Sequence, residues 1–363
     1  MILINRKNKK AFTLIELLVV IAIIGVLSTL VIVSLGDSRA KARDSKRLND
    51  LKAMANALEL YYANNNSYPQ AANFSPGQPL EAGGIVYMSK VPNNPTPHTD
   101  GNCPDSDYLY SQAQSGQSYV IGFCLGSDTP SLASGVHTVT SEGLNNVGLI
   151  AWWKFDETSG STATDHSSSG WNLTGINHAW LPSTDCRVGG CISFPGSSAR
   201  AYTPTGKVFT SPNQQLTFAM WAYRTGSSDG HFSLFGSSYQ GPNPYVWLFG
   251  NNSSSSLIIQ HRTNSSYTGS TLCSSCISLN SWNHYVITTD WIAKKASIYK
   301  DGVHVNTVNL HSETLFPDTS HVKIVNAYST GGGHGLYGRM DDYRIYNRVL
   351  SLEEIQMLYA LGQ

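Results

Sequence analysis

The sequence predicts an α+β protein in which a long N-terminal helix and a small β-containing head precede an all-β sandwich. Three observations predict this order: an apolar run from Phe12 to Leu35, a one-sided apolar stripe as far as Asn65, and short aromatic-rich segments after Leu149. Because the chain has 363 residues, two or three domains are expected.

The run from Phe12 to Leu35 has the length and composition of a membrane helix, since about 20 apolar residues cross a hydrocarbon core. Residues 1–11 contain four lysines and arginines and no acid. That bias keeps the N-terminus cytoplasmic and places the remainder outside. We therefore expect a single-pass protein of the cytoplasmic (inner) membrane whose bulk is extracytoplasmic or part of a cell-surface filament.

Glu16 separates the interpretations of this segment. A cleaved signal peptide has an apolar core of about 7–15 residues, much shorter than this one. A plain signal anchor fits the length but leaves Glu16 unexplained, because a carboxylate deep in lipid costs about 2.5–3.5 kcal/mol and usually has a partner. Glu16 therefore requires a cation.

The basic leader 1–11, the small Ala11 before Phe12 and the string Phe-Thr-Leu-Ile-Glu-Leu resemble the type IV prepilin class, which includes pilins and the pseudopilins of type II secretion. The resemblance implies that a prepilin peptidase cleaves between Ala11 and Phe12 and methylates the new amine. It also implies that Glu16 pairs with the Phe12 amine of a neighbouring subunit, which would compensate two buried charges. The chain departs from the family in having Ala11 where Gly is usual.

After a membrane or filament-core segment at 12–35, residues 36–126 are expected to form the rest of the helix and a pilin-like head. A stripe at steps of three and four predicts the face that packs on the head: Leu48, Leu51, Ala55, Leu58 and Tyr62. The other face is interpreted as solvated and charge-mixed, with contacts to lipid head groups, other subunits or nucleic acid as alternatives. Its cations are Arg39, Lys41, Arg43, Lys46, Arg47 and Lys52.

The remaining chain divides into a linker and a second domain. Residues 127–148 are rich in Ser, Thr and Gly without apolar periodicity, which predicts a linker. Residues 149–363 show short aromatic or alternating runs bounded by turn residues, as in a β-sandwich. Asp301-Gly302 predicts a hairpin turn, and Ser351 with Glu354 predicts a capping box that begins a final helix.

The second domain resembles the laminin-G-like, concanavalin A-like jelly rolls of bacterial surface proteins. The motifs are those at 148–160, 188–194, 282–285 and 336–351. The resemblance implies binding of a glycan or a surface protein, and a possible cofactor, structural calcium. Calcium takes several oxygen ligands, and the acids within these motifs are Asp156, Asp165, Asp341 and Asp342. Strand capping or pairing with arginine is the alternative role for these acids. Aromatic residues that would stack on sugars, unless they belong to the core, are Trp171, Trp180, Tyr239 and Tyr267.

The six cysteines fall into three close pairs, and an oxidising extracytoplasmic setting favours disulfides. Sequence alone permits 15 connectivities. The local set is favoured: Cys103 with Cys124, Cys186 with Cys191, and Cys273 with Cys276. A redox role for the last pair lacks the strand-to-helix context of such motifs.

The net charge and the sequence motifs limit the classes of function to be expected. Without the leader's four cations, 20 basic residues face 24 acidic ones, so general nucleic-acid binding is not expected. No catalytic constellation is evident, and no enzymatic activity is expected. We expect a pilus-like filament subunit, minor or tip-located because its second domain is bulky, that displays a lectin-like domain. The alternatives are a type II secretion pseudopilin and a membrane-tethered enzyme acting on polysaccharide.

Overall fold

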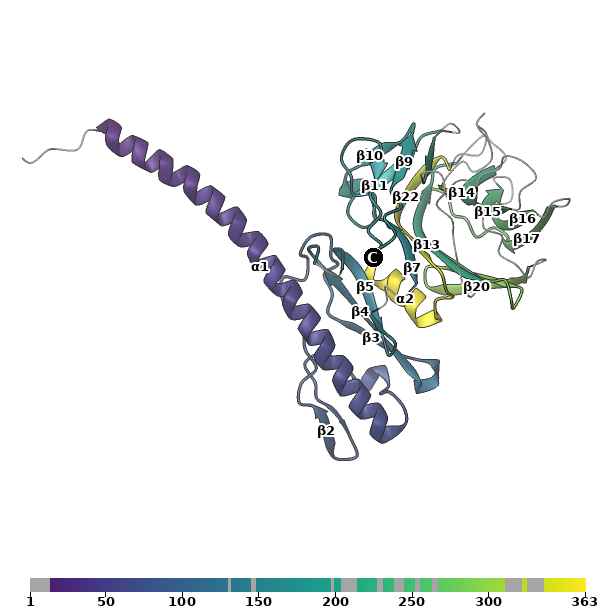
Figure 1. Cartoon of the computed structure of the whole chain (residues 1–363), viewed down its shortest axis with the longest axis horizontal. Coiled ribbons are helices and arrows are strands. Elements are labelled where there is room, and N and C mark those ends of the chain that lie inside the picture. Colours follow the sequence, from purple (N-terminus) through teal and green to yellow (C-terminus); the bar gives the residue numbers. More distant parts are fainter. Residues whose placement is uncertain are drawn as a thin grey trace, which may run out of the picture.

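The computed structural model describes residues 14–129, 132–144, 148–196, 199–203, 214–226, 231–237, 245–251, 255–262, 267–310, 322–324 and 336–363. Of residues 26–35 it describes the backbone alone. A long helix, a small head and a two-sheet sandwich follow one another along the chain (Figure 1). This arrangement confirms the α+β prediction.

The helix α1 (Leu14–Asn65) is continuous over 52 residues, or about 78 Å at about 1.5 Å per residue. Its first half projects away from the rest of the molecule (Figure 1). Its second half buries Leu51 and Leu58 against the head, as the apolar stripe predicts, and also Met54, which the stripe does not include. The helix ends before Asn66, whose φ of 53° lies in the left-handed region.

The head contains a four-stranded antiparallel sheet in the order β3-β4-β5-β6 and a separate hairpin of β1 and β2. The strands are β1 (Leu80–Ala82), β2 (Ile85–Met88), β3 (Leu109–Ala113), β4 (Ser118–Leu125), β5 (Gly135–Thr140) and β6 (Gly143–Leu144). Short 3-10 turns occur at η1 (Ala71–Asn73) and η2 (Gln114–Gly116).

Strands β5 and β6 lie inside the segment that the sequence predicts to be a linker, so the prediction for 127–148 is wrong over these residues. β5 pairs with β4 along its full length. Its two valines, Val136 and Val139, are three residues apart and therefore point to opposite faces of the sheet, one into each of two cores. No alternation appears in the sequence because both faces are buried and polar residues fill the remaining positions.

The second domain is a sandwich of two eight-stranded sheets. The first sheet contains β7 (Leu149–Trp153), β10 (Ala179–Leu181), β11 (Cys191–Phe194), β13 (Gln215–Arg224), β18 (Trp282–Asp290), β19 (Lys295–Lys300), β20 (Val303–Asn309) and β22 (Gly338–Tyr346). The second contains β8 (Thr162–Ala163), β9 (Leu173–Ile176), β12 (Arg200–Tyr202), β14 (His231–Ser237), β15 (Tyr245–Asn251), β16 (Ser256–Arg262), β17 (Tyr267–Cys273) and β21 (Val322–Ile324). A 3-10 turn, η3 (Ser183–Asp185), follows β10. The core between the sheets includes Trp153, Phe155 and Phe218.

The final helix α2 (Leu352–Leu361) begins with the capping box that the sequence predicts. The amide of Glu354 donates to the Ser351 hydroxyl, and the Ser351 amide donates to the Glu354 carboxylate. The helix lies between the head sheet and the first sheet of the sandwich (Figure 1). Ile355 and Leu358 share one core with Val120 of the head and Val286 of the sandwich, so the two domains pack as one unit.

The six cysteines form the three local disulfides, Cys103–Cys124, Cys186–Cys191 and Cys273–Cys276. The first joins the loop before β3 to β4 within the head. The second closes the loop that leads into β11, and the third lies at the end of β17.

Candidate functional site

The N-terminal motif is only partly within the described residues. Ala11 and Phe12 lie outside them, and Glu16 lies in the first turn of α1. Around Glu16 the helix exposes large apolar side chains, from Leu14 at 76% to Ile24 at 55%. Within the described parts of the chain, no helix meets the length and apolarity of a membrane span.

The charged face of α1 is not uniformly solvated, and the prediction fails at Arg47, which is 0% exposed. Arg47 pairs with the buried Asp44 at 2.7 Å and with Asp100 at 3.1 Å. Asp44 also accepts hydrogen bonds from the Gly126 and Ser127 amides, at 3.0 and 2.9 Å. These bonds tie two head loops to the helix.

Asp100 belongs to the same network because Arg43 donates two hydrogen bonds to its carboxylate. The hydrogen bond from Arg43 holds the pKa of Asp100 below its usual range, and the charge of Arg47 acts in the same direction. The loop that begins at Asp100 is therefore fixed on α1, and its residue Asn102 reaches the second domain.

The four carboxylates considered for calcium are held by different loops. Asp165 accepts hydrogen bonds from the Trp152, Ser167 and Trp171 amides. Asp342 pairs with Arg344 at 2.9 Å and accepts from the Trp152 indole.

Asp341 and Asp156 likewise accept from backbone amides, those of Arg187 and Val188 for Asp341 and that of Gly190 for Asp156. Within the described ranges, His, Cys, Asp and Glu do not gather in groups of three or more that would suit a metal. In the structure these four acids hold loop amides or pair with arginine, which is the alternative role that the sequence analysis gives them.

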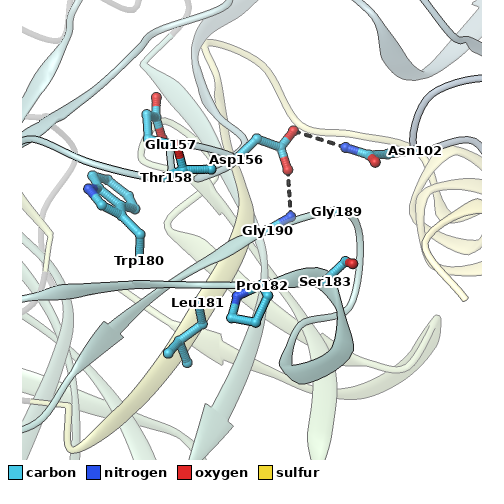
Figure 2. Close-up of a pocket in the computed structure, with 10 residues that line it drawn as sticks. All are labelled: Asn102, Asp156, Glu157, Thr158, Trp180, Leu181, Pro182, Ser183, Gly189 and Gly190. Atoms are coloured by element: carbon cyan, nitrogen blue, oxygen red, sulfur yellow. Dashed lines mark hydrogen bonds between the residues drawn. The ribbon is translucent and has the colours of Figure 1, made fainter.

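A cavity of about 440 Å³ opens where the head meets the sandwich (Figure 2). Its walls come from the head loop that contains Asn102, the segment after β7, and the end of β10 with the β10–β11 connection. The lining residues are Asn102, Asp156, Glu157, Thr158, Trp180, Leu181, Pro182, Ser183, Gly189 and Gly190.

Asp156 joins the two domains at this cavity. Its carboxylate accepts a hydrogen bond of 2.6 Å from the Gly190 amide and one of 3.3 Å from the Asn102 side chain (Figure 2). The preceding Phe155 is fully buried and has a φ of 64°, a conformation that non-glycine residues rarely adopt. Burial raises the pKa of Asp156, and the Gly190 hydrogen bond partly offsets that effect.

The loop from Cys186 to Cys191 forms the opposite wall and is fixed at several points. The disulfide closes it, and Asp341 of β22 accepts from the Arg187 and Val188 amides at 2.9 and 2.8 Å. Gly189 has a φ of 70°, and a Cβ at this position would overlap both Asp156 and Asn102. Glycine therefore lets the head and the sandwich approach one another here.

Trp180 of β10 forms an aromatic wall of the cavity. It packs partly against the sandwich core, and its indole donates to the Gly160 carbonyl at 2.9 Å, which fixes the ring. Glu157 stands on the same side and accepts from the Thr164 amide at 2.7 Å. Its carboxylate points in a different direction from that of Asp156 (Figure 2).

The other aromatics considered for sugar binding do not meet at this cavity. Trp171 packs against the sandwich core, and its carbonyl accepts from Trp153. Tyr239 lies outside the described residues, as does the side chain of Tyr267.

Asn102 is the residue that sequence reasoning misses, because it lies 54 positions from Asp156 and belongs to the other domain. The paired glycines Gly189 and Gly190 are a signal that a backbone approaches closely there, but they do not identify the partner.

A long helix on a small head, joined to a jelly-roll sandwich, defines a prepilin-like subunit with a concanavalin A-like domain. Residues 6–32 match the prokaryotic N-terminal methylation motif, and residues 195–356 match the concanavalin A-like lectin/glucanases superfamily. The type II secretion system core protein G of Klebsiella pneumoniae is 36% identical over 134 residues, covering 34% of this chain and 87% of that protein. The chain belongs to this core protein G family of pseudopilins.

Coverage of the relatives varies. The core protein G of Aeromonas hydrophila is 40% identical over 65 residues, and the match spans 18% of this chain but 46% of that protein. Among solved structures, the botulinum neurotoxin serotype D binding domain has a TM-score of 0.46 and 14% identity, covering 60% of this chain and 53% of that chain. That likeness carries no information on the ligand of this chain.

Proposed function

We propose that this chain is a pseudopilin-like subunit that assembles through α1 and displays its concanavalin A-like domain outside the filament. The observation that carries the proposal is the exposed apolar first half of α1, where Leu14, Ile15 and Ile21 are each more than half exposed. A surface of this kind marks an interaction site, because monomeric soluble proteins rarely leave such patches open. The helices of other pilin or pseudopilin subunits are the partners it fits.

We propose that the N-terminal segment is also cleaved and methylated. A prepilin peptidase at the inner membrane would cleave after Ala11 and methylate the Phe12 amine, leaving a cation four residues before Glu16. In the assembled filament, the carboxylate of Glu16 would pair with that amine of a neighbouring subunit. Before assembly, residues 12–35 would hold the subunit in the membrane, with the head and sandwich on the extracytoplasmic side.

The display role is supported by the packing of α2. Because Ile355 and Leu358 share a core with the head and with the sandwich, the second domain has a fixed position on the pilin head. We propose a binding role for it, toward a glycan or a surface protein, and no catalysis. Membership of the core protein G family favours a secretion pseudopilus over an adhesive pilus.

The test is the Glu16→Ala substitution, made in the cells that produce this protein. We expect a chain that still begins at methylated Phe12 by mass but does not cross-link to other pilin or pseudopilin subunits in intact cells. Asp37→Ala, which removes an exposed acid later on the same helix, is the matched control and should assemble normally. Normal incorporation of the Glu16 variant, or a chain retaining Met1, would contradict the proposal.

A further inference from the structure

We propose that the cavity between the head and the sandwich is a composite binding site for an uncharged oligosaccharide, with Asn102 of the head and Trp180 of the sandwich as its two essential contacts. The proposal rests on the display role above only for its biological setting. The site itself is tested on the isolated full chain.

The cavity is a formed site and not a chance gap between domains. Its floor is held by the Cys186–Cys191 disulfide and by the two amides that Asp341 binds. Its head side is held through Asp100, which two arginines of α1 fix in place two residues before Asn102. Fixed walls lower the ordering cost of binding.

The site is also divided between domains. Asn102 is the head residue that lines the cavity, and its amide donates to Asp156 across the junction. One amide hydrogen and the side-chain oxygen of Asn102 have no part in that bond and can serve a ligand. A sandwich without the head would lack this wall.

The lining indicates the chemical class of the ligand. One indole wall, an amide, hydroxyls of Thr158 and Ser183, and two carboxylates line a space of about 440 Å³. An indole offers a flat apolar face to a sugar ring, while amide and carboxylate oxygens accept from its hydroxyl groups. The volume suits a small ligand or the end of a chain, since ligand sites run from about 300 to 1,000 Å³.

The charge of the lining disfavours anionic ligands at this cavity. Among the described residues that line the cavity there are two acids and no lysine or arginine, which disfavours phosphate, sulfate and acidic sugars. A cationic peptide would have to be held by Glu157 or Asp156, the two acids of the lining, and hexalysine tests that class. Burial raises the pKa of Asp156, and both of its oxygens already accept hydrogen bonds, which makes it a weak anchor for a cation.

The experiment is calorimetric titration of the full chain, in a detergent without a sugar head group, with cellohexaose, maltohexaose, mannohexaose and chitohexaose, and with hexalysine. We expect at least one saccharide to bind. Trp180→Ala should weaken that binding about tenfold or more, which corresponds to about 1.4 kcal/mol, and Asn102→Ala should weaken it several-fold. Trp282→Ala, at a partly exposed tryptophan that does not line the cavity, should leave it unchanged.

Each other outcome overturns part or all of the proposal. Failure of all four saccharides to bind, or binding that both cavity variants retain, removes the site. If binding is lost in Trp180→Ala but unchanged in Asn102→Ala, the site belongs to the sandwich alone. If hexalysine is the only ligand that binds, the site takes a different class of ligand.

If Trp180→Ala does not fold, Gly189→Ala provides a second test because a Cβ there would displace Asp156 and Asn102. It should abolish saccharide binding while thermal unfolding stays cooperative. Filament incorporation of these variants should remain normal, so failure of the cavity proposal is distinguishable from failure of the assembly proposal.

Discussion

The head sheet is covered by one helix on each face, and the two helices are held by different forces. All eight residues of β4 are buried: Tyr119, Ile121 and Phe123 face α1, whereas Val120 and Cys124 face α2. α1 adds a buried network of ions around Arg47 to its apolar contacts. In the contact of α2 with the head, apolar packing dominates.

The two helices contribute different properties to the head. Buried ion pairs fix a geometry strictly, because losing one partner leaves an uncompensated charge. Apolar packing stabilises without such directional demands and tolerates substitutions that keep the volume. α1 is therefore fixed in register with the head. The joint between the head and the sandwich, which α2 forms, depends on how well this helix fills its space.

The largest expected effect comes from breaking the α1 network. Arg47→Met should lower the free energy of unfolding of the head by about 3–5 kcal/mol, because the buried Asp44 would lose its cation and Asp100 would keep only Arg43. Denaturant unfolding measures this effect. The control is Lys46→Ala, whose exposed pair with Asp50 should contribute less than about 1 kcal/mol. Equal effects of the two variants would show that the burial of Arg47 is unimportant.

A cavity created in the core of the joint should destabilise the contact between the head and the sandwich. Ile355 is 0% exposed, so Ile355→Ala should cost about 2–4 kcal/mol. Thermal unfolding should then resolve into separate transitions for the head and the sandwich. Gln356→Ala, at an exposed neighbour on the same helix, should change stability by no more than about 0.5 kcal/mol. A single transition lowered as a whole would show that the domains remain coupled without this contact.

Two buried histidines near the joint should make the stability of the protein fall in acid. Burial lowers the pKa of His137 to about 4 and that of His284 to about 3, from an ordinary 6.5. Because both are neutral when folded, their stabilisation is complete above pH 6.5 and is lost as the pH falls toward 4. Stability should fall by about 1.4 kcal/mol per pH unit for each histidine in that window.

Substitution separates this effect from general acid unfolding. His137 bonds the Ala133 carbonyl through Nε2 at 2.7 Å, and the amide of His137→Gln can donate in its place. That variant should show a shallower loss of stability between pH 6.5 and 5. His304→Gln, at an exposed histidine of β20, should keep the wild-type slope. An unchanged slope in the His137 variant would assign the acid sensitivity elsewhere.

The smallest expected effect is at the start of α2. Ser351→Ala removes the hydroxyl that accepts from the Glu354 amide and should cost about 1 kcal/mol. Ser351→Thr keeps the cap and should cost less. Differential scanning calorimetry of both variants checks the difference, and equal melting temperatures would mean that packing alone positions the helix.

Local signals in the sequence predicted much of this fold. The Asp301-Gly302 turn joins β19 and β20 with both residues at positive φ, and the capping box begins α2. Such features depend on a few adjacent residues, whose chemistry decides the conformation.

The features that sequence did not predict depend on distant residues. The continuous apolar run of β4 indicates a strand buried on both faces, but nothing near it identifies α2 as the second cover. Likewise, the position of Arg47 on the charged face of the helix predicts an exposed side chain. In the structure, Asp100 and Asn94 contact this side chain and it is buried. Asn102 enters the cavity for the same reason, through packing between domains.

The order of the elements along the chain has a further consequence. α2 completes the core on one face of the head sheet, yet it is synthesised after every strand of the sandwich. The sandwich therefore interrupts the head as an insertion does. A chain cut between the head and the sandwich should therefore not release the sandwich, because its far end remains docked on the head through α2.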